Sequence, residues 1–151
     1  MKKRKKLRVI IDTNLFVSGI ILLQGYPFEL LELLRKNTYT LLTSKEIIEE
    51  LEDVLKRPKF KRYKLSQERI VTLIRFVKKR SETTISTNKL AITIRDPKDK
   101  NLLSTAIEGK VDCIITGDED LLVLSGDPKL GKLKITTAKD FISIWETQTN
   151  K

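Results

Sequence analysis

Acidic side chains stand at the ends of predicted strands and at the start of a predicted helix. Asp12 follows one buried strand, Asp118 and Asp120 follow another, and Asp99 opens a helix. Because the carboxyl ends of parallel strands meet at one edge of a sheet, we expect Asp12, Asp118 and Asp120 to converge there. Asp99 joins them only if its helix begins at the same edge. Carboxylates held close together repel one another unless cations neutralise them. In a chain with a net charge of +10, this cluster predicts a metal site.

The chain contains no histidine and a single cysteine, Cys113. This composition excludes Ser-His-Asp and Cys-His catalysis and most zinc sites, which need His or several Cys. Carboxylates and water instead suit Mg²⁺ or Mn²⁺. Two such ions bridged by carboxylates can hold a phosphodiester for in-line attack by water. The composition therefore favours metal-assisted hydrolysis over histidine chemistry.

Each of these carboxylates also has a structural interpretation as a helix cap. Asp12, Asp96, Asp99, Asp118 and Asp140 all occur where a cap would stand, and taken singly each is better explained that way. Helix capping does not explain why several carboxylates are expected at the same edge of the sheet. Asp96 also competes with Asp99 for the position nearest the cluster, because a small shift of the helix start exchanges their roles.

A fourth carboxylate can come from the helix predicted over residues 45–56. At 100° per residue, its apolar side chains fall within one arc. They are Ile47, Ile48, Leu51, Val54 and Leu55. Glu50 and Glu52 lie on the two flanks of this arc, from which a carboxylate can reach the rim of a site. The helix geometry nominates both residues and does not choose between them.

Predicted strands alternate with predicted helices, which is typical of an α/β protein with a parallel sheet. The strands are predicted at residues 7–11, 39–42, 83–85, 90–94, 111–116 and 133–136. The helices are predicted at residues 27–37, 45–56, 66–80, 96–109 and from 137 onward, with 18–25 as a loop or a continuing helix and 121–124 as a short turn. We expect one domain over residues 7–147, preceded by a flexible basic N-terminus at residues 1–6.

The chain carries 30 basic and 20 acidic residues, an excess that attracts polyanions such as nucleic acid. A lysine-rich surface that only aids solubility is the alternative. Residues 59–64 concentrate basic charge around aromatic side chains, so we predict nucleic-acid contacts from Lys59, Lys61, Arg62 and Tyr63. A solvated connector is the competing interpretation of this segment.

No apolar run in the sequence is long enough to span a bilayer, so we expect no membrane contact. The basic N-terminus is not followed by the apolar core of a signal peptide. A single cysteine fits a reducing compartment. We therefore expect the protein in the cytoplasm.

Four short motifs resemble those of the PIN-domain family of metal-dependent nucleases. The segments that carry the resemblance are Val9–Asn14, Glu50-Leu51, Asp99 with Ala106, and Thr116–Leu121. They occur in the family's order, and the resemblance covers about residues 7–145. It implies a single-domain α/β/α sandwich with a mainly parallel central sheet, and it selects Glu50 over Glu52.

Residues 96–99, together with residues 56–60, are similar to a PIN subgroup of toxins from toxin–antitoxin pairs. This resemblance implies an endoribonuclease that uses Mg²⁺ or Mn²⁺ and forms homodimers. It also implies a cognate antitoxin that covers the site.

The same resemblance implies roles for individual residues. The metal ligands would be Asp12, Glu50, Asp99 and Asp118, with Asp120 as a further candidate. Asn14, Thr116 and Asp96 would orient ligand carboxylates or metal-bound water. Lys98, beside the third acidic motif, would contact nucleic acid.

Other functions compete with the toxin interpretation. One is a non-catalytic RNA- or protein-binding module on the same fold, and another is a housekeeping RNA-processing nuclease. A nucleotide-handling enzyme of doubly wound fold is disfavoured, because the sequence contains no glycine-rich phosphate-binding motif.

Overall fold

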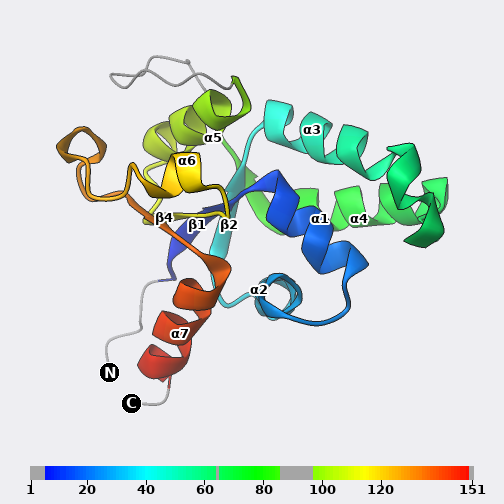
Figure 1. The fold of residues 1–151 in the computed structure, drawn as a ribbon, viewed down its shortest axis with the longest axis horizontal. Coiled ribbons are helices and arrows are strands. Elements are labelled where there is room, and N and C mark those ends of the chain that lie inside the picture. The colour runs from blue at the N-terminus through cyan, green and yellow to red at the C-terminus, as the bar shows by residue number, and fades with distance from the viewer. Residues whose placement is uncertain (1–5, 64, 86–96, 150–151) are drawn as a thin grey trace.

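The computed structural model describes residues 6–63, 65–85 and 97–149, which form one parallel sheet flanked by helices (Figure 1). Within these residues the sheet has five strands in the order β3-β2-β1-β4-β5, and every neighbouring pair is parallel. The strands are β1 (Arg8–Ile11), β2 (Thr40–Thr43), β3 (Ser81–Thr83), β4 (Cys113–Ile115) and β5 (Lys134–Thr136). The predicted α/β class with a parallel central sheet is confirmed.

Helices cover both faces of the sheet. They are α1 (Thr13–Ile21), α2 (Tyr26–Arg35), α3 (Lys45–Leu55), α4 (Gln67–Lys79), α5 (Pro97–Glu108), α6 (Glu119–Leu122) and α7 (Ala138–Thr149). Two short 3₁₀ helices, η1 (Pro58–Tyr63) and η2 (Pro128–Leu130), lie among them. Figure 1 shows α5 and α6 above the sheet and α2 and α7 below it. This arrangement is the α/β/α sandwich expected from the sequence.

Alternate side chains of each strand pack into separate cores on the two faces of the sheet, as the two-residue period of a strand requires. In β1, Val9 and Ile11 pack against α1, α2, α3, α4 and α7, whereas Ile10 packs against α5 and α6. All three residues are at most 1% exposed. Because helices cover both faces, the strand is apolar from Val9 to Ile11, which is the pattern that identifies it in the sequence.

Side-chain caps fix where the helices that carry acidic residues begin. Ser44, rather than Thr43, caps α3, since its hydroxyl accepts a hydrogen bond from Ile47 N at 3.2 Å. Asp12 caps α1, which starts directly after β1 and continues to Ile21. The residues at 18–21 are therefore helical, and α1 and α3 both start at the edge of the sheet where a strand ends.

The observed elements differ from the predicted ones mainly at their ends. The edge strand predicted at 83–85 lies at Ser81–Thr83, because α4 ends at Lys79 and the chain pairs with β2 almost at once. The turn predicted at 121–124 is in large part the helix α6, and most of the basic segment 59–64 belongs to η1. The strand predicted at 90–94 and residues 1–5 of the predicted flexible N-terminus lie outside the described residues.

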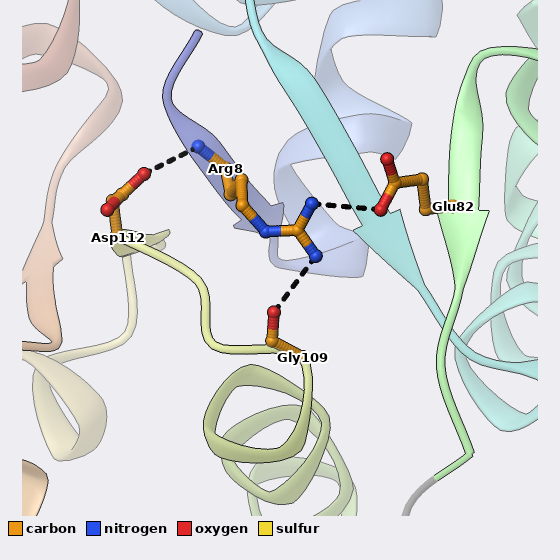
Figure 2. Close-up of polar contacts among 4 residues, drawn as sticks. All are labelled: Arg8, Glu82, Gly109 and Asp112. Atoms are coloured by element: carbon orange, nitrogen blue, oxygen red, sulfur yellow. Dashed lines mark hydrogen bonds and ion pairs between the residues drawn. The ribbon is translucent and has the colours of Figure 1, made fainter. Parts of the chain in front are cut away.

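Arg8 connects several elements at the edge of the sheet where the strands begin (Figure 2). Its guanidinium donates to Glu82 Oε2 of β3 at 2.9 Å and to the carbonyl oxygen of Gly109, just after α5, at 3.0 Å. Its backbone N–H donates to Asp112 Oδ2 at 2.8 Å. The last carbonyls of a helix carry the negative end of its dipole, which a guanidinium stabilises. Arg8 therefore holds the starts of β1 and β3 to the end of α5.

Among the described helices, none is by itself long and apolar enough to cross a bilayer. The helices α1 and α2 meet that criterion only when they are joined across a bend of 93°.

Candidate metal-binding cleft

Asp12 lies at the junction between β1 and α1. Its backbone N–H donates to the carbonyl of Ile115 in β4 at 2.9 Å, which extends the parallel ladder one residue past the strand. Its Oδ1 accepts a hydrogen bond from Asn14 N at 3.2 Å and so caps α1. The positive end of the α1 dipole favours an ionised carboxylate here. Asp12 is therefore both a helix cap and a carboxylate placed at the strand-end edge of the sheet.

Thr116, directly after β4, links Asp12 to Asp118. Its backbone N–H donates to Thr136 O at 2.9 Å, and the residue is fully buried. Its hydroxyl donates to Asp12 Oδ2 at 2.7 Å and accepts from Asp118 N at 3.0 Å. One buried hydroxyl thus orients the Asp12 carboxylate and fixes the backbone at Asp118. This geometry supports the role predicted for Thr116, which stays a prediction.

Asp118 caps the short helix α6. Its Oδ1 accepts a hydrogen bond from Asp120 N at 2.9 Å. The Asp118 side chain is half-buried and lines a cleft, whereas Asp120 is exposed and lies outside the cleft lining. The turn uses the backbone of Asp120 to hold Asp118, and the Asp120 side chain is left in solvent. Asp120 is therefore not among the residues that line the cleft, and its role as a further metal ligand stays a prediction.

The carboxylate on α3 is Glu50. Glu50 is half-buried and lines the same cleft as Asp118. Glu52, on the other flank of α3, pairs with Lys56 one turn later, with 3.0 Å between Oε1 and Nζ. The geometry therefore distinguishes two residues that the helical pattern alone leaves equal.

Asp99 lies in the first turn of α5 and is only 9% exposed. It lines the same cleft, so α5 begins at the edge of the sheet that carries the other carboxylates. The predicted convergence of Asp99 with Asp12 and Asp118 required its helix to begin at this edge. Asp96, its competitor in the sequence, lies outside the described residues, as does the side chain of Lys98.

The cleft has a volume of about 80 Å³, enough for several water molecules or a hydrated ion. Its lining comes from the β1–α1 junction, α3, α5 and the start of α6, and consists of Asp12, Thr13, Asn14, Ile47, Glu50, Asp99, Leu102 and Asp118. Thr13, Ile47 and Leu102 are not among the site residues predicted from the sequence. Ile47 had a detectable signal, since it lies three residues before Glu50 and therefore beside it on the helix.

These residues suit a hard divalent cation. Carboxylate oxygens and water are the ligands that Mg²⁺ and Mn²⁺ prefer. Among the residues that the structure describes, no three carboxylates lie close enough together to hold one ion jointly. Mg²⁺ usually keeps several water ligands and takes only one or two protein carboxylates. The donor set therefore fits a hydrated ion in a cleft of this size.

The predicted nucleic-acid contacts lie elsewhere. Lys59, Lys61, Arg62 and Tyr63 belong to η1, at the end of α3 that is farther from the sheet (Figure 1). The three cations are exposed and Tyr63 is half-buried. None of the four lines the carboxylate cleft. The structure therefore groups these residues with one another but not with the carboxylates.

Neither Cys113 nor the cavity beside it adds a second candidate site. Burial, with the negative charge of Asp112, raises the pKa of the Cys113 thiol to about 12. Such a thiol stays protonated near neutral pH and is a poor nucleophile. Cys113 borders a cavity of about 770 Å³ beside β5 and α7, whose described lining includes a single carboxylate, Asp112. Cavity size therefore does not identify the chemical site.

Comparison with known proteins gives the family. The model of the PIN domain matches residues 8–120, well over half of the chain and a range that contains all four cleft carboxylates. An uncharacterized protein of Methanocaldococcus jannaschii, MJ1680, is 33% identical over 146 residues that cover 93% of each chain. The crystal structure of VapBC2 from Rickettsia felis, bound to a DNA fragment from their promoter, contains a similarly folded chain. Its TM-score is 0.58 at 19% identity, over 87% of this chain and 98% of that one. The chain described here therefore belongs to the PIN-domain family, a family of nucleases.

Proposed function

We propose that this PIN-domain protein is a metal-dependent endoribonuclease that hydrolyses RNA phosphodiester bonds. The observation that carries the proposal is the cleft in which Asp12, Glu50, Asp99 and Asp118 meet. In a chain with a net charge of +10, divalent cations are the best explanation for carboxylates gathered in this way.

Mg²⁺ or Mn²⁺ is the proposed cofactor, in keeping with the general use of divalent ions by PIN nucleases. The candidate ligands are Asp12, Glu50, Asp99 and Asp118, with Asp120 as a further candidate; one or two of them would bind the ion directly and the others through its water ligands. A bound divalent ion makes water a stronger nucleophile near neutral pH and offsets the charge of the scissile phosphate.

The surrounding residues prepare the cleft for this chemistry. The Thr116 hydroxyl and the Asn14 N–H already hold the two oxygens of Asp12, so its carboxylate needs little reorganisation. Ile47 and Leu102 form an apolar wall, which lowers the local dielectric and strengthens the interactions of the charges beside it. The exposed Asn14 side chain stands at the mouth of the cleft, where it can orient water or a phosphate oxygen.

The RNA substrate and the biological role form the finer part of the proposal. The basic surface supports a polyanionic substrate. The likeness in fold to a chain of VapBC2, which binds a fragment of its own promoter, supports a toxin of a toxin–antitoxin pair. We therefore propose a cytoplasmic homodimer whose carboxylate cleft is covered by a cognate antitoxin.

Cleavage of RNA in defined metals tests the enzymatic proposal. Purified protein, treated with EDTA and then supplied with Mn²⁺ or Mg²⁺, should cut single-stranded RNA only when the metal is present. Asp140→Asn is a matched control for Asp12→Asn, because Asp140 is also at a helix start but is exposed and outside the cleft lining. The control should cleave and the Asp12 variant should not. Cleavage that persists in EDTA would sink the proposal.

Three other outcomes would distinguish the toxin role from the alternative functions. RNA binding without turnover, across several metals and RNAs, would indicate a non-catalytic binding module. A small protein encoded beside this gene that co-purifies with the chain and blocks cleavage would support the toxin role. Cleavage of one defined cellular RNA, with no such inhibitor, would indicate a housekeeping RNA-processing nuclease instead.

A further inference from the structure

We propose that η1 and the end of α3 form an anchoring site for single-stranded RNA, separate from the carboxylate cleft. The site consists of Arg57, Lys59, Lys61, Arg62 and Tyr63, called here the α3–η1 anchor. The inference rests on the proposed ribonuclease function and extends it, since it says where the substrate is held away from the bond that is cut.

The segment that carries the anchor is held in place by the core. Pro58 starts η1, and Phe60 N donates to the carbonyl of Arg57 at 3.0 Å. Phe60 and Leu65 are partly buried and pack against the larger core cluster. Phe60 therefore holds η1 against the core, and the cations of η1 project from a helical turn.

The 3₁₀ geometry sorts the side chains by face, because residues three apart are eclipsed. Phe60 and Tyr63 share the inner side, with 6.4 Å between ring centroids. Lys59 and Arg62 share another side. Each of these cations lies against an aromatic ring, with Lys59 Nζ 5.0 Å from the Phe60 centroid and the Arg62 guanidinium carbon 4.9 Å from that of Tyr63. Arg62 also donates to the Tyr63 hydroxyl at 2.8 Å.

The anchor cations are available for phosphate. Within the described part of the chain, no carboxylate pairs with Arg57, Lys59, Lys61 or Arg62, whereas neighbouring Lys56 is paired with Glu52. A hollow of about 240 Å³ lies beside them. It is lined by Leu55, Lys56, Arg57, Phe60, Lys61, Leu65, Gln67 and Ile70. Proteins bind single-stranded nucleic acid with cations that contact the phosphates and aromatic rings that stack on the bases. The anchor combines both features, since unpaired cations and the Tyr63 ring lie beside a partly apolar hollow.

The helix α3 relates the anchor to the cleft. Glu50 lies five residues, or about 7.5 Å along the axis, before the end of α3 at Leu55, and Arg57 follows just beyond that end. The outer face of α3 carries Glu46, Glu49 and Asp53, all exposed. These acids repel a phosphate backbone, which restricts RNA to the flank that joins the cleft to the anchor. A strand cut in the cleft therefore reaches the anchor only if it extends beyond the cut site.

Binding of RNA to a triple variant, Lys59→Gln with Lys61→Gln and Arg62→Gln, tests the anchor. The matched control is Lys36→Gln with Lys78→Gln and Lys79→Gln, three exposed cations that end α2 and α4 at the opposite edge of the sheet. Both variants lose three positive charges. The probes are a fluorescent 12-nucleotide RNA, a dinucleotide and a DNA duplex, titrated in EDTA at several salt concentrations so that no probe is cut.

The expected result is a loss of affinity for the 12-nucleotide RNA of about tenfold or more in the anchor variant and little change in the control. Each phosphate contact to a single strand adds about 0.7 to the slope of log affinity against log salt, so the slope should fall by about 2. Equal losses in the two variants would show only an effect of total charge and would overturn the proposal. So would a loss confined to the DNA duplex, or an equal loss for the dinucleotide.

Binding and cleavage separate this inference from the proposed function. If wild-type protein cuts RNA and the anchor variant binds it like the control, the anchor is wrong and the nuclease function stands. If no metal supports cleavage, yet the anchor variant alone loses salt-dependent binding, the anchor stands and the nuclease function is wrong. Tyr63→Phe and Tyr63→Ala add a finer readout, since stacking survives the first change and is lost in the second.

Discussion

The charged side chains at the two edges of the sheet differ in the partners that they contact. At the edge where the strands begin, Arg8 meets Glu82 and the carbonyl of Gly109, so a cation, an anion and a helix end are joined within the protein (Figure 2). At the edge where the strands end, Asp12 and Asp118 accept hydrogen bonds from a hydroxyl and from backbone N–H groups. Within the described residues no ion pair reaches either of them.

The charged groups at the first edge join elements of the fold, whereas those at the second edge line the candidate site. The Arg8 network is complete and its members stabilise the elements they join. The carboxylates of Asp12 and Asp118 are oriented by neutral donors and share one cleft with two further carboxylates. Such an arrangement costs stability without a cation, because like charges repel. A function that needs a cation is the reason to keep it.

Removing a charge at the carboxylate edge should have the largest effect. We expect Asp12→Asn to lower RNA cleavage by more than about a hundredfold, because a metal ligand is lost. The fold should survive, since Asn is also a good helix cap. Cleavage rates with Mn²⁺ and a thermal melt measure the two effects. A variant that is folded and still cleaves at the wild-type rate would remove Asp12 from the site.

Adding a cation should stabilise only the carboxylate edge. At a Mn²⁺ concentration 100 times its Kd, binding adds about 2.7 kcal/mol to the free energy of unfolding, or roughly 5–10 °C in Tm for a chain of this size. Arg8→Ala should keep this shift and Asp12→Asn should lose it, as melts with and without metal would show. An equal shift in all three proteins would mean that the ion binds elsewhere.

Thr116→Val should damage the carboxylate edge without removing a carboxylate. The change keeps the shape of the side chain but removes the donor to Asp12 Oδ2 and the acceptor for Asp118 N. We expect cleavage to fall by about 10–100-fold, as for partners that orient metal ligands. Thr116→Ser keeps the hydroxyl and should restore most of the rate. If valine and serine behave alike, the hydroxyl has no orienting role.

The smallest effects belong to the opposite edge. Arg8→Ala should cost about 1–2 kcal/mol of unfolding free energy, since the Arg8 and Glu82 side chains are 30% and 58% exposed and solvent screens their attraction. The coupling between Arg8→Ala and Glu82→Gln in a double-mutant cycle should be below about 1 kcal/mol. Denaturant titration measures both quantities. Loss of cleavage in folded Arg8→Ala would contradict the view that the Arg8 edge contributes only to stability.

The sequence contains enough information for the strand-end carboxylates. Asp12 and Asp118 each follow an apolar, largely β-branched strand, and parallel pairing brings the ends of such strands to one edge. The choice between Glu50 and Glu52 needs more than the helical pattern, because both flank the apolar arc equally. One difference is local, since Lys56 pairs with Glu52 one turn later. The other is tertiary, since the start of α5 lies near Glu50.

Other features depend on contacts that no local pattern carries. Gly19 weakens the helix prediction for α1. The structure nevertheless needs glycine there, because a Cβ would lie 2.6 Å from the carbonyl oxygen of Pro27 in α2. Asp120 is a different case, because the turn that caps α6 is local: it uses the Asp120 backbone and leaves the side chain exposed. The role of that side chain as a ligand stays a prediction.

The pairing of β1 with β4 also governs when the carboxylate cleft can form. Thr116 and Asp12 are separated by 104 residues, and only the register of Ile11 with Ile115 brings them together. Contacts this distant in sequence carry a high loop-closure cost and form late in folding. During synthesis, β2 becomes available to β1 early, but β4 exists only after three quarters of the chain has been made. The growing polypeptide is therefore without the carboxylate cleft until β4 docks beside β1.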